Sequence, residues 1–444
     1  MDNKKGNKTI SGFSKLSKRG KIKWIVQNFF KEPDTVMSEL MSYWHSNEEQ
    51  QKILDAFSEN TISNFPMPFG VAPNFIIDDK AYCVPMVIEE SSVVAAASAA
   101  AKFWMDRGGF HTEILSTKKL GQVHFLWHGD KAKLLYHFPE LKQKLIEECF
   151  SITKSMVKRG GGILDIELLD LTDKHPGLYQ LLASFETCDS MGANFINTCL
   201  EQFSKSLISH IQSDSHFDQD REVEIVMSIL SNYTPECIVR AWVECPVVDL
   251  GKFPNGMSAE TFAHKFSTAI RIAEIDPYRA TTHNKGIYNG IDAVVIATGN
   301  DFRAIEACGH TYAAKDGHYD SLSHCTVEEG IFKFWLDLPL AVGTVGGLTS
   351  LHPIAKRSLE LLEKPTAREL MSIIAAAGLA QNFSALRSLV TTGIQQGHMK
   401  MHLQNILNQL KATKDEEVSA IEHFANKIVS FSAVREYLEK LRLS

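Results

Sequence analysis

The stretch KLGQVHFLWHGD, residues 119–130, begins a run of segments whose order predicts the fold of the middle of the chain. It is a strand pattern followed by a turn, and a long helical pattern comes next. Two strand patterns, a second long helical pattern and a final strand complete the order β-α-β-β-α-β, which predicts a four-stranded antiparallel sheet with two helices on one face. The further strands are expected at 163–171, 177–188 and 222–230, and the helices at 131–159 and 191–211.

A candidate phosphate-binding turn is DSMGAN, residues 189–194, where a predicted strand gives way to a helix. Gly192 allows the backbone to approach a ligand closely, and the following helix N-terminus offers free N–H groups to a pyrophosphate. Asp, Ser and Asn at a helix start more often serve only as caps, so both interpretations stay open. The segment has no GxGxxG motif, which leaves a Rossmann domain unsupported. Asp165, after a run of three glycines, is a candidate acceptor for a ribose diol.

A second candidate site is the stretch DPYRATTHNKGIYNGIDAVVIATGND, residues 276–301. Its apolar, β-branched run at 293–298 predicts a buried strand, and the segment after Asp301 predicts a helix. A carboxylate is stabilised at a helix N-terminus, so Asp301 is expected there. Lys285 in a glycine-rich turn, close to an Asp held at a strand end, is an arrangement that builds a catalytic cation. An N-cap Asp beside a surface Lys explains the same residues equally well.

Two further segments carry candidate residues. An Ala-rich helix is predicted from Ser92, with Glu90 just before its cap, and its small side chains allow close approach by a ligand or by another helix. Helix packing is the more frequent explanation. Near the C-terminus, Gly393 and Gly397 precede His398 and a helix, which fits a mobile lid that delivers a general acid. A single His at a helix start is more often structural.

The composition excludes several classes of protein. The chain has 444 residues, 44% apolar and 22% charged, which is typical of a globular protein of about two or three domains. A net charge of -7 argues against a nucleic-acid partner. No apolar run approaches the roughly 18 residues needed to cross a bilayer, and the basic N-terminus lacks the apolar core of a signal peptide. None of the eight cysteines is in a CxxC pair, so we expect reduced thiols, no metal site and a cytoplasmic protein without membrane contact.

Six segments together resemble the hydroxymethylglutaryl-CoA reductase family, in its soluble class II form. They occur in the family's order, between about residue 55 and about residue 405. The segments are VPMVIEESSVVAAAS (84–98), DSMGAN (189–194), DPYRATTHNKGIYNGIDAVVIATGND (276–301), GTVGGLTSLHP (343–353), GLAQN (378–382) and GHMKMH (397–402). Two positions depart from the family's pattern, with Ser190 where Ala is usual and Leu348 where a small residue is common.

The resemblance implies an α+β protein with three parts. A large mixed helical and sheet domain, formed by residues 1–112 and 236–392, would bind the CoA substrate. A ferredoxin-like domain at 113–235 would be inserted in it and bind the nicotinamide cofactor, and residues 393–444 would form a mobile helical flap. The family assembles dimers with active sites between subunits, so a homodimer or a higher multiple is expected.

The same resemblance implies the catalytic set Glu90, Lys285, Asp301 and His398. The implied reaction is the two-hydride, four-electron interconversion of (S)-3-hydroxy-3-methylglutaryl-CoA with (R)-mevalonate and CoA, in the mevalonate route to isoprenoids. Lys285 would stabilise the oxyanion at the thioester carbon, and Asp301 would orient Lys285 and favour its charged form. His398 would protonate the CoA thiolate, and Glu90 would supply or steer the proton for the second reduction.

The binding residues also follow from the resemblance. The implied substrate contacts are Ser92, Arg279, Thr282, Asn289 and Asn382. The implied cofactor contacts are Asp165, Asp189, Met191, Gly192, Ala193, Asn194 and Asn232. Arg279 is the natural clamp for the substrate carboxylate, and an acid at Asp165 would repel a 2′-phosphate, so NAD(H) is favoured with NADP(H) as the alternative. Two other classes stay open: another CoA-thioester enzyme such as an acyltransferase or lyase, which would need a nucleophile with an adjacent base, and a non-catalytic homologue.

Overall fold

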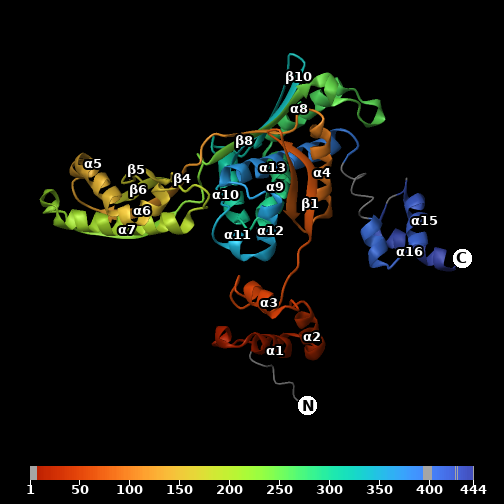
Figure 1. Ribbon diagram of the computed structural model, residues 1–444, viewed down its shortest axis with the longest axis horizontal. Coiled ribbons are helices and arrows are strands. Elements are labelled where there is room, and N and C mark those ends of the chain that lie inside the picture. The colour runs from red at the N-terminus through yellow and green to blue at the C-terminus, as the bar shows by residue number, and fades with distance from the viewer. Residues whose placement is uncertain (1–7, 394–402, 426, 428, 444) are drawn as a thin grey trace.

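The computed structural model describes residues 8–393, 403–425, 427 and 429–443 of the chain. Within these residues, two four-stranded antiparallel sheets and a two-stranded hairpin are packed with helices. Figure 1 shows the smaller helix-and-sheet unit to one side of the main body, with short helical units near both ends of the chain. The predicted α+β class is confirmed.

The sheet predicted from the sequence pattern forms between residues 119 and 230. Its strands are β4 (Lys119–Trp127), β5 (Gly162–Asp170), β6 (Leu178–Glu186) and β7 (Val223–Leu230), in the spatial order β5-β6-β4-β7. Its helices are α5 (Lys131–Glu148), α6 (Phe150–Val157) and α7 (Ala193–Ser213), followed by a 3-10 turn at Ser215–Phe217. Alternate residues of β4 are buried, and Val123, Phe125 and Trp127 form one hydrophobic cluster with the helices. The predicted β-α-β-β-α-β order is confirmed, with the first helix divided at Cys149.

The second sheet joins strands that lie far apart in the sequence. Its strands are β3 (His111–Ile114), β8 (Ile238–Pro246), β9 (Ser323–Glu328) and β10 (Ile331–Pro339), in the order β3-β8-β10-β9, and a separate hairpin is formed by β1 (Phe69–Ile77) and β2 (Lys80–Val87). The helices of this part are α4 (Ser91–Met105), α8 (Ala259–Ile275), α9 (Pro277–Ala297), α10 (Phe302–Ala313), α11 (Leu348–Leu351), α12 (Pro353–Leu361) and α13 (Ala367–Val390), with 3-10 turns at Val247–Leu250 and Pro254–Gly256. Because β3 and β8 are hydrogen-bonded neighbours, the whole smaller sheet is an insertion between two paired strands.

The stretch 276–301 folds differently from its prediction. Residues 293–298, predicted as a strand, form the last turns of α9 and its C-cap. Three consecutive residues from Ala293 are fully buried, and a run buried on every side has no period that separates a strand from a helix. The strand prediction is therefore wrong, whereas the helix that begins after Asp301 is confirmed as α10.

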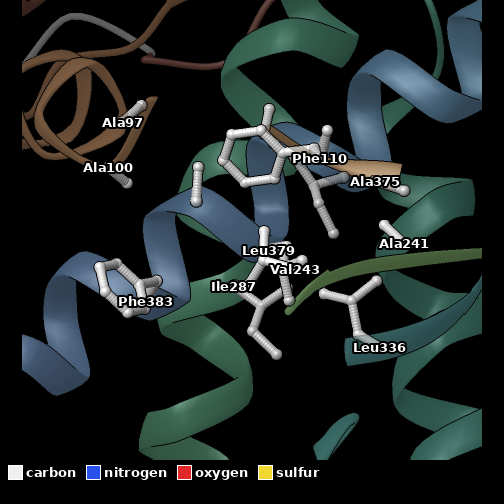
Figure 2. Packing of buried hydrophobic residues seen from close by; sticks show 14 of the residues in the cluster. Ala97, Ala100, Phe110, Ala241, Val243, Ile287, Leu336, Ala375, Leu379 and Phe383 are labelled. Carbon is white, nitrogen blue, oxygen red and sulfur yellow. The ribbon is translucent and has the colours of Figure 1, made fainter. Parts of the chain in front are cut away.

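Helices α9 and α13 cross in the core at two glycines. A Cβ on Gly290 would lie 2.6 Å from the carbonyl oxygen of Ala377, and one on Gly378 would lie 2.8 Å from the Ile291 side chain. Figure 2 shows the surrounding apolar side chains, with Phe383 of α13 beside them. The absence of a side chain at both glycines lets the two helix backbones approach, which places the residues of α9 close to those of α13.

The Ala-rich helix α4 uses its small side chains on two faces. Ala97, Ala100 and Ala101 are fully buried in the core, where α4 contacts β1 and α13. Ala96 and Ala99 instead line a cavity between α4, α9 and α13. Both explanations of the small side chains therefore hold, each on its own face of the helix.

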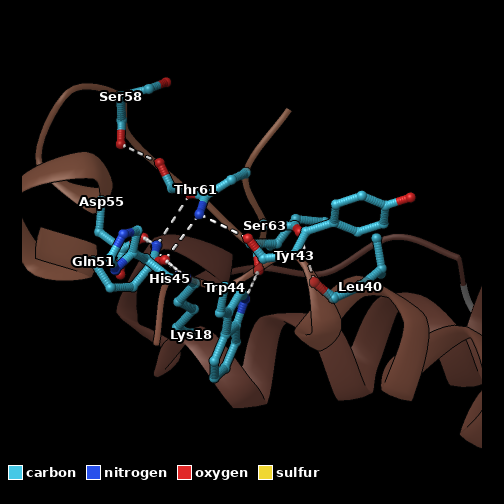
Figure 3. A network of polar contacts seen from close by, with 12 residues as sticks. Lys18, Leu40, Tyr43, Trp44, His45, Gln51, Asp55, Ser58, Thr61 and Ser63 are labelled. Carbon is cyan, nitrogen blue, oxygen red and sulfur yellow. Dashed lines mark hydrogen bonds and ion pairs between the residues drawn. The ribbon is translucent and has the colours of Figure 1, made fainter. Parts of the chain in front are cut away.

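The N-terminal helices form a unit that extends from the main body (Figure 1). They are the 3-10 turn Phe13–Lys15, α1 (Lys18–Phe29), α2 (Pro33–Ser42) and α3 (Glu48–Asp55). Polar contacts connect them, as Figure 3 shows: Nζ of Lys18 lies 2.6 Å from Oδ1 of Asp55, and the Trp44 indole donates to the Ile62 carbonyl at 2.9 Å. At the other end of the chain, α15 (Lys414–Phe424) and α16 (Phe431–Leu443) share a small apolar cluster of their own.

Helix α13 corrects the expectation that no apolar segment is long enough to cross a bilayer. Among the described residues it is the one helix long and apolar enough to cross a membrane by length and composition. Its side chains are largely buried against α4, α8 and α9 and against the second sheet. In this structure α13 is the central helix of the core.

Candidate active site

A cavity of about 560 Å³ opens between α4, α9 and α13, and we name it the α9 cavity. It brings together seven of the residues that the sequence singled out, although they come from three separate segments. These residues are Glu90, Ser92, Arg279, Thr282, Lys285, Asn289 and Asn382. Four of them are on α9 at spacings of three, three and four residues, which places their side chains on one helical face.

Lys285 and Glu90 form an ion pair in the α9 cavity. Nζ of Lys285 lies 3.6 Å from Oε2 of Glu90, and the other carboxylate oxygen accepts a hydrogen bond from Oγ of Ser92 at 2.7 Å. Glu90 is the N-cap residue of α4, but its side chain makes no capping hydrogen bond and is turned to these partners instead. The two side chains are 65% and 40% exposed, so the pair contributes little to stability and remains open to a ligand.

Arg279 supplies a second cation to the α9 cavity. Burial lowers the pKa of its guanidinium, and the carboxylate of Asp276 partly offsets this effect. No carboxylate lies within ion-pair distance of Arg279 in the part of the chain that the structure describes. A partly buried guanidinium without an acidic partner is suited to bind a carboxylate of a ligand through charge-assisted hydrogen bonds.

Asn382 is held by a buried chain of hydrogen bonds that the sequence analysis missed. Oγ of Ser323 donates to Oδ1 of Asn382 at 2.8 Å and lies 2.6 Å from Nε2 of His283. Because the serine has one proton and gives it to Asn382, the His283 imidazole must donate from Nε2. Burial, together with the charge of Arg279, lowers the pKa of His283 to about 3, so the ring is neutral. These hydrogen bonds fix the orientation of the Asn382 amide, so that its Nδ2 group stays available as a donor in the α9 cavity.

Within one chain Asp301 does not pair with Lys285, whose ion-pair partner is Glu90. Its carboxylate caps α10 by accepting from the backbone N–H groups of Arg303 and Ala304, and it forms an ion pair with Nε of Arg303 at 3.1 Å. Burial raises the pKa of Asp301, but these contacts outweigh it and leave the pKa below the usual value. Helix α9 continues for 12 residues after Lys285, or about 18 Å along its axis, which is further than the two side chains can span.

Asp301 instead shares a second cavity with the predicted phosphate turn. This cavity of about 480 Å³, which we name the turn cavity, is lined by segments around residues 190–195, 299–303 and 343–349. Gly192 precedes α7 with a φ of 91°, and a Cβ there would lie 2.4 Å from the Thr187 side chain. No side chain caps α7, so its first N–H groups are available to a ligand. Met191, Gly192, Ala193 and Asn194 all line this cavity.

The three remaining predicted cofactor residues lie in different places. Asn232 lines a small cavity with Met191 and Ala193, behind the turn. Asp189 uses its carboxylate to accept from the backbone N–H of Ala367 at the start of α13, at 2.8 Å, so it fixes the turn to the larger part of the protein. Asp165 is on β5 in an ion pair with Lys142 of α5, and this lysine lowers the pKa of the carboxyl.

His398 lies outside the described residues, so its position and its proposed role are not tested. The segment that leads toward it leaves from the α9 cavity, which is lined by Leu389, Thr391 and Thr392 at the end of α13. The connection therefore begins beside the Glu90–Lys285 pair.

The comparisons with known proteins agree with this arrangement. The model of the family described as hydroxymethylglutaryl-coenzyme A reductase matches residues 23–403. The 3-hydroxy-3-methylglutaryl-coenzyme A reductase of Archaeoglobus fulgidus is 37% identical over 440 residues, which cover 98% of this chain and 94% of the relative. A probable reductase of the same name from Borreliella burgdorferi is 29% identical over 98% of both chains. A class II reductase from Streptococcus pneumoniae, solved in open conformations bound to NADPH, superimposes with a TM-score of 0.70 at 35% identity, over 93% of this chain and all of the other. The chain belongs to the hydroxymethylglutaryl-coenzyme A reductase family.

Proposed function

We propose that the chain interconverts 3-hydroxy-3-methylglutaryl-CoA with mevalonate and CoA, using two equivalents of a nicotinamide cofactor. The observation that carries this proposal is the α9 cavity, where an unpaired guanidinium and an ammonium lie on one face of α9 and a carboxylate at the start of α4 pairs with the ammonium. Arg279 would bind the free carboxylate of the substrate, and Ser92, Thr282 and Asn382 would orient the acyl chain through hydrogen bonds.

The residues of the cavity suit each step of the chemistry. Nζ of Lys285 would donate to the thioester oxygen and stabilise the negative charge that forms there when the first hydride arrives. Collapse of the resulting hemithioacetal releases CoA thiolate, which we propose His398 protonates. Glu90, paired with Lys285 and Ser92, would pass a proton to the aldehyde oxygen during the second reduction. The bound nicotinamide supplies a hydride in both reductions.

The residues fit a dinucleotide at the turn cavity. We propose that Met191, Gly192, Ala193 and Asn194 bind its phosphates through the uncapped N-terminus of α7, with Asn232 behind the turn. The part between residues 113 and 235 would thus be the cofactor domain, and residues 1–112 with 236–392 the substrate domain. We retain NADH as the favoured cofactor because of the acid at Asp165, although its pairing with Lys142 weakens the repulsion of a 2′-phosphate. The pneumococcal relative was solved with NADPH, so kcat/KM for both cofactors must be compared, and a clear advantage of NADPH would refute the preference.

We also propose that the active unit is a homodimer, or a multiple of it, in which each Lys285 meets the Asp301 of a second copy. Apolar side chains are exposed around Asp301 and the adjacent glycine-rich segment, as expected for a covered face. These side chains are Phe302, Val345, Leu348, Leu351 and Ile354. A second copy would cover them and bring the turn cavity to the α9 cavity.

Two inactive variants test the dimer. Lys285→Ala and Asp301→Ala chains, co-expressed in equal amounts with different tags, should regain about a quarter of wild-type activity, because random pairing makes about half of the dimers mixed and one of the two sites in each mixed dimer has both residues. Each variant expressed alone should be inactive. If the mixture stays inactive while the tags co-purify, Lys285 and Asp301 do not meet across an interface.

The reductase assignment is tested by following nicotinamide absorbance after mixing the protein with 3-hydroxy-3-methylglutaryl-CoA. About two cofactors should be oxidised for each thioester consumed, and Lys285→Ala should reduce kcat by at least about 100-fold. Lys133→Ala, which removes an exposed lysine at the start of α5, is the matched control and should not change the rate. Absence of oxidation by either cofactor, and absence of the reverse reaction from mevalonate and CoA, would overturn the proposal.

The alternatives receive less support from the geometry. An acyltransferase with a cysteine nucleophile would need an accessible thiol, and none of the described residues that line the α9 cavity is a cysteine. Burial raises the pKa of Cys237 to about 12 and that of Cys245 to about 11, so neither thiol is reactive. All eight cysteines are free, which supports our proposal of a reducing, cytoplasmic location.

A further inference from the structure

A buried lysine lies directly behind the predicted phosphate turn. Lys119, the first residue of β4, is 4% exposed. Its Nζ donates to Oγ1 of Thr187 at 2.5 Å and to the backbone carbonyl of Ser190 at 2.9 Å. The Thr187 hydroxyl in turn donates to the same carbonyl at 2.7 Å. Two side chains therefore converge on one peptide group of the turn, although Lys119 is 71 residues away from it in sequence.

The protein around Lys119 does not neutralise its charge by direct contact. In the described part of the chain no carboxylate lies within ion-pair distance of its Nζ, and both hydrogen-bond partners are neutral oxygens. Burial lowers the pKa of Lys119, and the carboxylates of Glu186 and Asp189, which partly offset this effect, are engaged elsewhere. Glu186 accepts from the Thr117 hydroxyl and the Cys188 N–H, and Asp189 accepts from the first N–H of α13. A buried cation without a bound anion is costly, so an anion placed nearby would offset that cost.

The hydrogen bonds of Lys119 also fix the orientation of the peptide group between Ser190 and Met191. The peptide bonds are all trans in the described chain, so the N–H of Met191 points away from the Ser190 carbonyl. Because Lys119 and Thr187 hold that carbonyl toward the interior, the N–H faces the opposite side of the turn. There the turn packs closely against a second backbone segment: a Cβ on Gly343 would lie 2.4 Å from the Met191 nitrogen, and Ser190 forms a β-bridge with Val345. Ser190, Met191, Gly343 and Val345 all line the turn cavity. The lysine thus fixes the orientation of a peptide group at the edge of this cavity and adds positive charge behind it.

We propose that Lys119 is a positioning residue for the phosphates of the nicotinamide cofactor, acting through the Ser190–Met191 peptide and through its buried charge. The proposal rests on the proposed function, because it takes the ligand of the turn cavity to be a phosphate-bearing dinucleotide. Lys119 touches the turn and not the ligand, so it affects cofactor binding without taking part in hydride transfer. Lys119 lines the small cavity behind the turn and does not line the α9 cavity, where we propose that the 3-hydroxy-3-methylglutaryl group binds.

The test compares Lys119→Met with Lys119→Arg, since methionine keeps much of the chain length and removes the charge. We expect Lys119→Met to raise the KM and the dissociation constant for NADH and NADPH about tenfold, as loss of one unit charge near a partly desolvated phosphate requires. The KM for 3-hydroxy-3-methylglutaryl-CoA should stay within about twofold of wild type, and Lys119→Arg should restore most of the cofactor affinity. Thr187→Val, which removes only the hydroxyl, is a milder second variant and should raise the cofactor KM by a smaller factor.

Direct binding separates this proposal from the reductase proposal. Quenching of protein fluorescence by NADPH reports cofactor affinity without turnover. A wild-type protein that binds NADPH but oxidises none would refute the reductase assignment, and the same titration would still test Lys119. Unchanged cofactor affinity in Lys119→Met and Thr187→Val would overturn the proposal, and so would a loss that Lys119→Arg shares in full. An equal rise of the KM for both substrates would show a merely structural role and would also overturn it.

Discussion

Replacement of His283 by Gln should remove a defined part of the acid sensitivity of the protein. The imidazole is 2% exposed, and burial, with the charges of Arg279 and His324, lowers its pKa from 6.5 to about 3. His324 faces it from β9 and is itself 3.0 Å from a carboxylate oxygen of Glu274. A group whose pKa is lower in the folded state is protonated first in the unfolded chain. The contribution of His283 to stability is therefore complete above pH 6.5 and is lost as the pH falls toward 3.

The size of the effect follows from these two pKa values. Between pH 7 and pH 5 the unfolded chain takes up about 0.7 proton at this position, whereas the folded chain takes up almost none. Integration of the linkage relation gives a loss of about 2 kcal/mol over this interval. Glutamine can still donate to Ser323 but cannot be protonated, so the variant should lack this loss. The wild type should therefore be destabilised by about 2 kcal/mol more than His283→Gln between pH 7 and pH 5.

Urea unfolding at a series of pH values measures this difference, because titrations common to both proteins cancel. His128→Gln, which alters an exposed histidine of the smaller sheet unit, is the matched control and should follow the wild type. If the free energy of unfolding changes equally with pH in the wild type and in His283→Gln, the imidazole is not a buried neutral group. The argument that Nε2 donates to Ser323, and thereby orients Asn382, would then lose its basis.

Three further substitutions test the two cavities and the core. Arg279→Met should raise the KM for 3-hydroxy-3-methylglutaryl-CoA about 10- to 100-fold by loss of a charge-assisted hydrogen bond, with little change in the cofactor KM; equal changes in both would contradict the carboxylate clamp. Gly343→Ala would place a Cβ 2.4 Å from the backbone nitrogen of Met191 and should raise the cofactor KM alone, so an unchanged value in steady-state kinetics would show that the turn is not part of the cofactor site. Gly290→Ala should lower the free energy of unfolding by about 1–3 kcal/mol, because its Cβ would meet a carbonyl of α13. The control Gly286→Ala, on the same helix, meets no atom within 4 Å and should stabilise the protein in urea unfolding by up to about 1 kcal/mol. A stabilised Gly290→Ala variant would refute the close crossing of α9 and α13.

The smaller sheet was predictable because its signals are local. Strand β4 buries alternate residues, β6 is a short apolar run buried at most positions, and α7 carries an apolar stripe. The α9 segment offered no such signal, since Ala293 and its neighbours are buried on all sides. Its glycines suggested a turn, whereas Gly290 serves the contact of α9 with α13, which is 87 residues further along the chain at Ala377.

Some site residues also had a local signal in the sequence, whereas others had none. The spacing of Arg279, Thr282, Lys285 and Asn289 was visible in the sequence, although only as a motif and not as one face of a helix. Ser323 could not be identified, because its partners on α9 and α13 lie 40 and 59 residues away and no motif surrounds it. Buried polar contacts between distant segments depend on the tertiary fold and leave no period in the sequence.

The error over Asp301 shows how the length of α9 constrains the enzyme. Lys285 and Asp301 are 16 positions apart, and a turn directly after Lys285 would have allowed contact, but α9 continues for 12 residues after Lys285, about 18 Å along its axis. In one copy of the chain, Lys285 lines the α9 cavity while Asp301 lines the turn cavity beside exposed apolar side chains. In the homodimer that we propose, a second copy would bring its Asp301 to this Lys285. The acyl group would then be bound within one chain, whereas turnover would need the assembly.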